Sequence, residues 1–177
     1  MFKNHHLKIF LIALLLTLPQ LSLANGIVSS TIKNPDPYSG NQSWFRYYES
    51  PGNTVKDSVI LRNLGDQPIT IDVYATDAAS NQAGSFTLKT SSEEQKGIGL
   101  WAKVDRSEVT IQPDESIEVP FEINIPKDLA PGEYFGGIIN EENTQNSCDP
   151  IQSVSGHCTG NIQIKTRSGN RIYLTIP

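Results

Sequence analysis

The sequence has few of the side chains from which enzymes build their sites. It contains three histidines in 177 residues, and His5 and His6 lie near the amino terminus, so only His157 remains downstream. This argues against a Ser-His-Asp triad and against a histidine-rich metal centre. Phosphate-binding glycine loops and calcium-loop spacings are missing too. Acidic residues are numerous, so the composition is compatible with a glycosidase that uses two carboxylates. The sequence gives no pair of residues to nominate as nucleophile and base. We therefore expect a non-catalytic chain without a cofactor.

Basic residues are also scarce, with 14 Lys and Arg against 19 Asp and Glu, which gives a net charge of −5. The basic residues form no cluster. A nucleic-acid-binding surface needs many phosphate contacts, and an anionic membrane surface attracts polybasic segments. Both nucleic acid and a membrane surface are therefore poor candidates for the partner.

No apolar run is long enough to cross a membrane. The longest extends from Ile9 to Leu18, about half of the roughly twenty residues that a spanning helix needs. Lys3 and Lys8 precede it and Ser22-Leu23-Ala24 follows it. A basic segment, an apolar segment and a small-residue cleavage site are typical of a secretory signal peptide. We predict a signal peptide at residues 1–24 and an exported chain with no membrane span, located outside the cell, in the cell wall or in the periplasm.

The two cysteines, Cys148 and Cys158, both lie in the exported part. An even number of cysteines in an exported chain predicts a disulfide, with two free thiols as the alternative. They fall within a polar stretch, residues 141–161, that we expect to be a loop. The loop is interpreted either as a shaped protrusion or as an insertion without a function.

Residues 25–177 show the pattern of a single all-β domain. Between Ser116 and Ile125 apolar and polar residues alternate with a period of two, which predicts a strand with one buried face. Residues 69–76 alternate in the same way. Turn residues recur every eight to twelve positions, a spacing typical of a sandwich or barrel. We predict an immunoglobulin-like antiparallel β-sandwich.

Weaker patterns predict the remaining strands. They lie at residues 43–48, 55–61, 85–90, 109–111, 134–139, 162–165 and 171–176. We expect 134–139 to pair with 162–165, and a turn at Ser168-Gly169-Asn170 to precede the last strand. The polar residues 91–97 are expected to form a loop, and no helical periodicity follows Ala24.

Five consecutive aromatic or basic positions, residues 44–48, give candidate ligand-binding residues. A strand at 43–48 places Trp44, Arg46 and Tyr48 on one face and Phe45 and Tyr47 on the other. Aromatic rings beside a guanidinium suit sugar recognition by stacking and hydrogen bonding. The alternative is that Trp44 and Tyr48 are buried, because a one-residue slip exchanges the two faces.

A series of short motifs, taken in order, resembles one protein family. The motifs are Ser50-Pro51-Gly52, Val59-Ile60-Leu61-Arg62-Asn63, Tyr74-Ala75-Thr76-Asp77-Ala78 with Gly84, Gly99-Leu100-Trp101, Val109-Thr110-Ile111-Gln112-Pro113, Val119-Pro120-Phe121-Glu122-Ile123, Ile125-Pro126, Ala130-Pro131-Gly132-Glu133-Tyr134, Gly136-Gly137-Ile138-Ile139 and Arg171-Ile172-Tyr173-Leu174. Together they resemble the peptidoglycan-binding domain of the WxL-interacting proteins, which are bacterial cell-surface proteins. The resemblance implies an immunoglobulin-like fold and a cell-wall glycan as the partner. Members usually continue into a second domain and a membrane helix, which this sequence does not include.

Individual residues within these motifs have structural interpretations. Gly136-Gly137 inside a strand indicates a bulge or a close backbone approach. Trp101 is expected to anchor the core, and an exposed sugar-stacking platform is the alternative.

The sequence leaves three hypotheses for the function. The first is a module that binds the cell wall or another surface protein. The second is an assembly factor resembling a pilus chaperone, which would lend the strand Ser116–Ile125 to a subunit. The third is a passive spacer in a surface complex.

Overall fold

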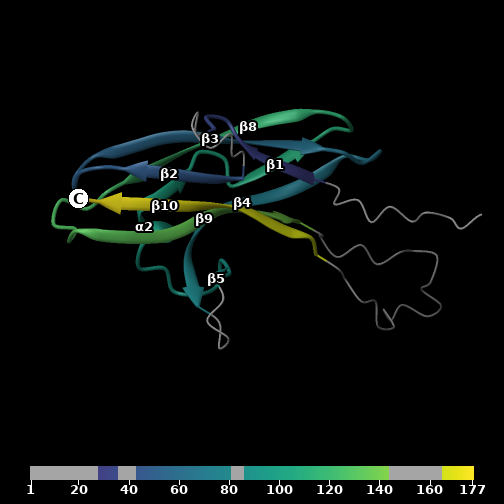
Figure 1. Ribbon diagram of the computed structural model, residues 1–177. Helices are drawn as coiled ribbons and strands as arrows, with labels where there is room; N and C mark the ends of the chain where they lie inside the picture. Colours follow the sequence, from purple (N-terminus) through teal and green to yellow (C-terminus); the bar gives the residue numbers. More distant parts are fainter. Residues whose placement is uncertain (1–27, 36–42, 81–85, 144–164) are drawn as a thin grey trace, which may run out of the picture.

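Two β-sheets pack face to face (Figure 1) in the computed structural model, which describes residues 28–35, 43–80, 86–143 and 165–177. The first sheet has the order β1-β3-β8-β6 and the second the order β2-β10-β9-β4-β5, with β7 also paired to β4. The bounds are β1 Val28–Ile32, β2 Trp44–Tyr48, β3 Thr54–Asn63, β4 Ile69–Ser80, β5 Phe86–Leu88, α2 Ile98–Trp101, β6 Ala102–Val104, β7 Glu108–Ile111, β8 Ser116–Asn124, β9 Gly132–Glu142 and β10 Arg167–Ile176. The predicted immunoglobulin-like β-sandwich is confirmed.

The core lies between the sheets and follows the alternation in the sequence. In β8, Val119, Phe121 and Ile123 are buried, and Glu118 and Asn124 are exposed. Phe121 meets Phe45 of the other sheet edge to face, with ring centroids 5.0 Å apart. Fully burying one such side chain contributes about 1.5–3 kcal/mol. The two-residue period therefore sets which face of each strand joins the core.

One strand pair departs from the expected antiparallel arrangement. Strands β2 and β10 run parallel, with Trp44 beside Arg171 and Tyr48 beside Thr175. A parallel pair needs a long connection between its strands, and here almost the whole domain lies between them. The other strand pairs of the described residues are antiparallel, as predicted, so this edge is the one exception.

The carboxyl-terminal strand begins earlier than predicted. Residues 168–170, expected to form a turn, lie within β10 and pair with β9 from Ser168↔Asn140 to Asn170↔Ile138. Their polar side chains are bonded, since Asn140 donates to Ser168 Oγ at 2.6 Å and Ser30 donates to Asn170. Residues 134–139 pair with this strand, at Tyr134↔Leu174 through Ile139↔Gly169. Residues 162–164, the other partner that the sequence suggested for this segment, lie outside the described residues.

Several short elements carry no clear sequence pattern. Strands β1 and β6 and the four-residue helix α2 were not expected, and α2 is too short to show helical periodicity. Within the described residues, no helix has the length and apolar character that crossing a membrane requires. The predicted signal peptide, Cys148, Cys158 and His157 lie outside the described residues, so the predictions made for them stay predictions.

Candidate functional site

The candidate ligand residues lie on the outer face of the second sheet. In β2, Phe45 is 2% exposed, whereas Trp44 is 37% and Tyr48 71% exposed, and Arg46 is exposed as well. Tyr47, on the inner side, donates its hydroxyl to Asp57 at 3.0 Å. Burial first, and then the Asp57 carboxylate, raise the pKa of Tyr47 above its usual range. The alternative register, with Trp44 and Tyr48 buried, is not the one adopted.

Strands β10 and β9 extend this group across the sheet. The parallel register places Arg171 beside Trp44 and Tyr173 beside Arg46, and Phe135 of β9 pairs with Tyr173. The Phe135 and Tyr173 rings meet edge to face at 5.8 Å. Residues from three strands, distant in sequence, therefore form one continuous surface.

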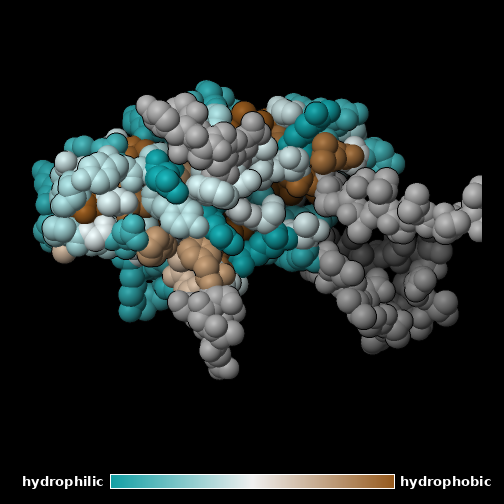
Figure 2. All heavy atoms as spheres, viewed as in Figure 1, coloured by the Kyte–Doolittle hydropathy of each residue, from teal (hydrophilic) through white to brown (hydrophobic). Residues whose placement is uncertain are grey.

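Strand β5 adds a fifth aromatic ring. Phe86 stacks on Tyr173 at 6.4 Å, and the Arg171 guanidinium carbon lies 4.7 Å from the Phe86 ring centroid. We call this surface the aromatic face, and its members are Trp44, Arg46, Tyr48, Phe86, Phe135, Arg171 and Tyr173. In Figure 2 a hydrophobic patch, coloured tan, lies where β5 meets the sheet, beside polar residues in teal.

Arg167 holds β5 above the sheet. Its guanidinium donates to the carbonyl oxygens of Leu88, at 3.4 Å, and Lys89, and its Nε donates to the Tyr74 hydroxyl at 3.2 Å. Glu141 accepts a hydrogen bond from Tyr74 at 2.8 Å. Burial first, and then the bond to Glu141, raise the pKa of Tyr74, so this hydroxyl stays protonated. This network places Phe86 against Arg171 and Tyr173.

The aromatic face combines two kinds of recognition chemistry. Its rings offer flat apolar surfaces, on which apolar faces of a ligand can stack. Arg46 and Arg171 make no ion pair with a carboxylate among the described residues. A guanidinium in this state is available to bind a carboxylate through two parallel hydrogen bonds. The arrangement suits a polymer that carries both sugar rings and carboxylates.

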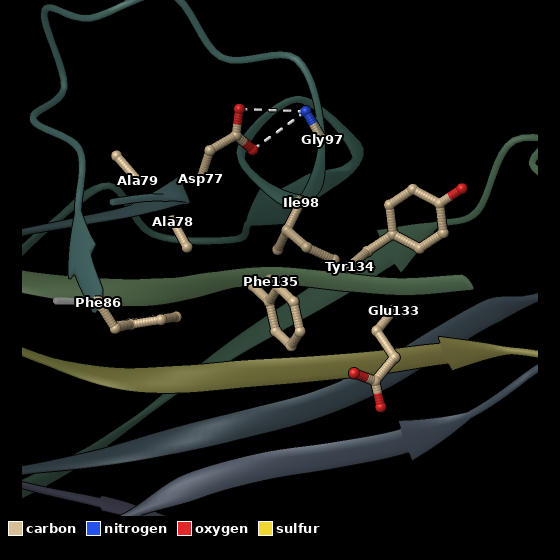
Figure 3. Close-up of a pocket in the computed structure, with 9 residues that line it drawn as sticks. All are labelled: Asp77, Ala78, Ala79, Phe86, Gly97, Ile98, Glu133, Tyr134 and Phe135. Carbon is tan, nitrogen blue, oxygen red and sulfur yellow. Dashed lines mark hydrogen bonds between the residues drawn. The ribbon is translucent and has the colours of Figure 1, made fainter. Parts of the chain in front are cut away.

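A hollow of about 310 Å³ adjoins the aromatic face under β5 (Figure 3). Phe86 and Phe135 point toward one another at one side of it, and Ile98 and Tyr134 lie on the other side of the β9 ribbon. The lining residues are Asp77, Ala78, Ala79, Phe86, Gly97, Ile98, Glu133, Tyr134 and Phe135.

Asp77 holds the loop that precedes α2. Its carboxylate accepts the backbone N–H groups of Gly97 at 3.0 Å, Gly99 at 2.8 Å and Lys96, and Lys89 Nζ lies 3.5 Å away. Burial acts to raise the pKa of Asp77, but the three N–H groups and Lys89 outweigh it and lower that pKa below its usual value. All of these partners are structural, so Asp77 has no free lone pair to offer a ligand.

The two strand glycines serve close packing, as one of the two sequence interpretations predicts. A Cβ on Gly136 would lie 2.4 Å from Ile98 Cβ and 2.6 Å from the Thr76 carbonyl oxygen. At Gly137 it would lie 2.8 Å from Leu88 Cδ1. Both strand registers run through these residues without a break, so the bulge is not present.

Trp101 packs against the core, as predicted, and its ring meets that of Tyr134 edge to face at 5.3 Å. It does not belong to the aromatic face. Among the described residues no group of three or more His, Cys, Asp or Glu side chains is placed to hold a metal ion.

The strand that the chaperone-like hypothesis requires is not a free edge. Strand β8 pairs with β3 along its length, and Phe121–Ile123 also pair with β6. Lending a strand to a subunit needs an open edge. The position of β8 therefore argues against that alternative.

Residues 29–142, well over half of the chain, match the family described as WxL Interacting Protein, peptidoglycan binding domain. The chain belongs to this family. The resemblance inferred from the ordered motifs is thus confirmed, and the family indicates a cell-surface protein that binds the cell wall. The matched segment includes Trp44, Arg46, Tyr48, Phe86 and Phe135, whereas Arg171 and Tyr173 lie beyond it. No curated protein matches the chain.

Solved structures show the same kind of fold at low sequence identity. A family 123 glycoside hydrolase from Clostridium perfringens is 10% identical with a TM-score of 0.54; the match covers 85% of this chain and 27% of the hydrolase. This likeness extends to the fold and not to activity, and the chain spans about a quarter of that protein. A PapD-like domain of human CEP192 is 10% identical (TM-score 0.48; 90% of this chain, 92% of that one). The E. coli chaperone DraB is 11% identical (TM-score 0.46; 76% and 53%).

Proposed function

We propose that the chain is an exported, non-catalytic module that binds peptidoglycan of the cell wall through the aromatic face. The observation that supports this most is the cross-strand arrangement of Trp44 beside Arg171 and Arg46 beside Tyr173. It brings stacking surfaces together with two guanidinium groups that make no ion pair with the described residues, on one side of an acidic protein. The family to which the chain belongs supplies the ligand class.

The carboxylates near the aromatic face support a role without catalysis. A glycosidase needs two carboxyl groups that flank the scissile bond, one as an acid and one as a base or nucleophile. The hollow beside the face is lined by two, Asp77 and Glu133. Asp77 is fully engaged by backbone N–H groups and Lys89. Glu133 alone does not make a catalytic pair.

Co-sedimentation with purified cell-wall sacculi tests the proposal. We predict that Trp44→Ala weakens binding roughly tenfold, about 1.4 kcal/mol, because it removes an aromatic stacking surface. Its melting temperature should stay within a few degrees of the wild type, since Trp44 is partly exposed. Arg62→Ala is the matched control, because Arg62 is an exposed arginine of the opposite sheet, paired only with Asp114 at 3.6 Å.

Two outcomes contradict the proposal. If the wild-type chain does not sediment with sacculi, glycan binding fails, and the surface-protein or spacer alternative takes its place. If Trp44→Ala and Arg62→Ala weaken binding equally, the chain binds the wall through another surface.

A further inference from the structure

Strands β4 and β9 separate at one end of the second sheet. They pair from Ile71↔Glu142 to Asp77↔Gly136, and the pairing stops there. Beyond this point β4 pairs with β5, at Ala78↔Leu88 through Ser80↔Phe86. Residues 132–135 of β9 pair with β10 alone. Within the described part of the chain, β9 thus has an open edge over these four residues.

The open edge presents backbone N–H and C=O groups that can form hydrogen bonds. Alternate residues of a strand direct their N–H and C=O groups to opposite sides, so half of those in residues 132–135 point away from β10. In the described ranges, no backbone bond outside the sheets involves Glu133, Tyr134 or Phe135. Backbone groups without a protein partner pair with water or with a ligand, and an open edge is a template for an added strand.

The hollow of about 310 Å³ lies against this edge. Its inner end is closed by Ile98, which packs on Gly136. Its lining combines apolar side chains with the carboxylates of Asp77 and Glu133, and the side chains of Ala78 and Ala79 that also line it are small. The volume is at the lower end of those found for ligand sites. It therefore suits a short extended segment better than a folded domain.

Charges of both signs flank the opening. Glu133 lines the hollow, and Arg171 lies over Phe86, whose ring lines the same hollow. Neither residue makes an ion pair with the described residues. An extended peptide that carries both a free carboxylate and a side-chain amine would complement this arrangement. The peptide stems of peptidoglycan have this chemistry, and the glycan to which they are joined would lie on the adjoining aromatic face.

We propose that the hollow between β4, β5 and β9 receives a peptide stem of the wall polymer, whose amide groups hydrogen-bond to the open edge of β9. This inference rests on the proposed function and names the part of peptidoglycan that the protein recognises. Hydrogen bonds to the open backbone groups supply affinity, and the hollow supplies selectivity through the side chain that it admits.

The test compares soluble glycan strands that keep their stems, released by an endopeptidase that cuts the cross-links, with strands from which an amidase has removed the stems. We expect the chain to bind the stem-free strands roughly tenfold more weakly. Ala78→Leu, which fills the hollow, should reduce binding to stem-bearing strands to the stem-free level and leave binding to stem-free strands unchanged. Ala130→Leu, at an exposed alanine before β9, is the matched control, and melting temperatures confirm that both variants fold.

A second measurement separates this inference from the proposed function. Soluble stems released by the amidase are added to the chain, and the backbone amides of residues 133–135 are followed by NMR and hydrogen exchange. Shifts and protection at these amides support stem binding at the edge of β9, even if sacculi are not bound and the proposed function fails. Equal binding to stem-bearing and stem-free strands, or unchanged amides in the presence of stems, overturns the inference while leaving glycan binding by the aromatic face intact.

Discussion

Asp77 shows how one buried acidic side chain can organise the neighbourhood of a binding surface. Its carboxylate accepts three backbone N–H groups, including those of Gly97 and Gly99, and so fixes the start of α2. Ile98 of α2 then packs on Gly136 and closes the inner end of the hollow. A single carboxylate therefore sets the shape of the hollow without contacting a ligand.

We predict that Asp77→Asn lowers the free energy of unfolding at pH 7 by about 2 kcal/mol, because buried N–H groups lose charged acceptors. The pKa of Asp77 is lower in the folded chain than its ordinary value of 3.8. Its contribution is therefore fully present above pH 3.8 and is lost as the pH falls through the lowered pKa. Urea titrations of both proteins between pH 7 and pH 2 should show curves that converge on acidification. A constant difference across that range would mean that the charge of Asp77 contributes nothing.

At the scale of one element, β8 provides a direct test of strand register. Phe121 is 2% exposed and contacts Phe45, whereas Glu122 faces outward, 4.0 Å from Lys56. We predict that Phe121→Ala lowers the free energy of unfolding by about 3–5 kcal/mol, as expected for emptying a buried aromatic site. Glu122→Ala should change it by no more than about 0.5 kcal/mol, since exposed ion pairs contribute little. Similar effects in urea titrations would contradict the register.

The elements also show what local pattern can and cannot predict. The alternation in β8 and β4 predicts their buried faces, because a period of two belongs to the strand itself. The outward position of Trp44 follows from the same rule once the register of β2 is known. Phe86, Phe135, Arg171 and Tyr173 join it through pairings between distant segments and through the position of β5 above the sheet. No sequence window contains that information, so four of the seven residues of the aromatic face could not be predicted.

For the whole molecule, we predict that the exported chain begins at Asn25 and carries a bond between Cys148 and Cys158. Removing residues 1–24 takes away two lysines and no acidic residue, which moves the net charge from −5 to −7. The short loop closed by the bond should stabilise the fold by about 3 kcal/mol in the chain-entropy model. Intact-mass measurement before and after reduction and alkylation checks both points. Two thiols that react without reductant would show that the bond is not formed.

The parallel pairing of β2 with β10 has a mechanical consequence. The amino-terminal end of β2 and the carboxyl-terminal end of β10 lie at opposite ends of the pair (Figure 1). Tension applied between the start of β2 and the end of β10 therefore pulls the two strands past each other and loads their hydrogen bonds together. A hairpin pulled open at its ends would instead lose them one at a time. The strand that carries Trp44, Arg46 and Tyr48 thus resists shear, and single-molecule pulling with handles at residues 44 and 176 should register a high unfolding force. A protein held to the wall through β2 and loaded through the end of β10 would keep its binding surface in place.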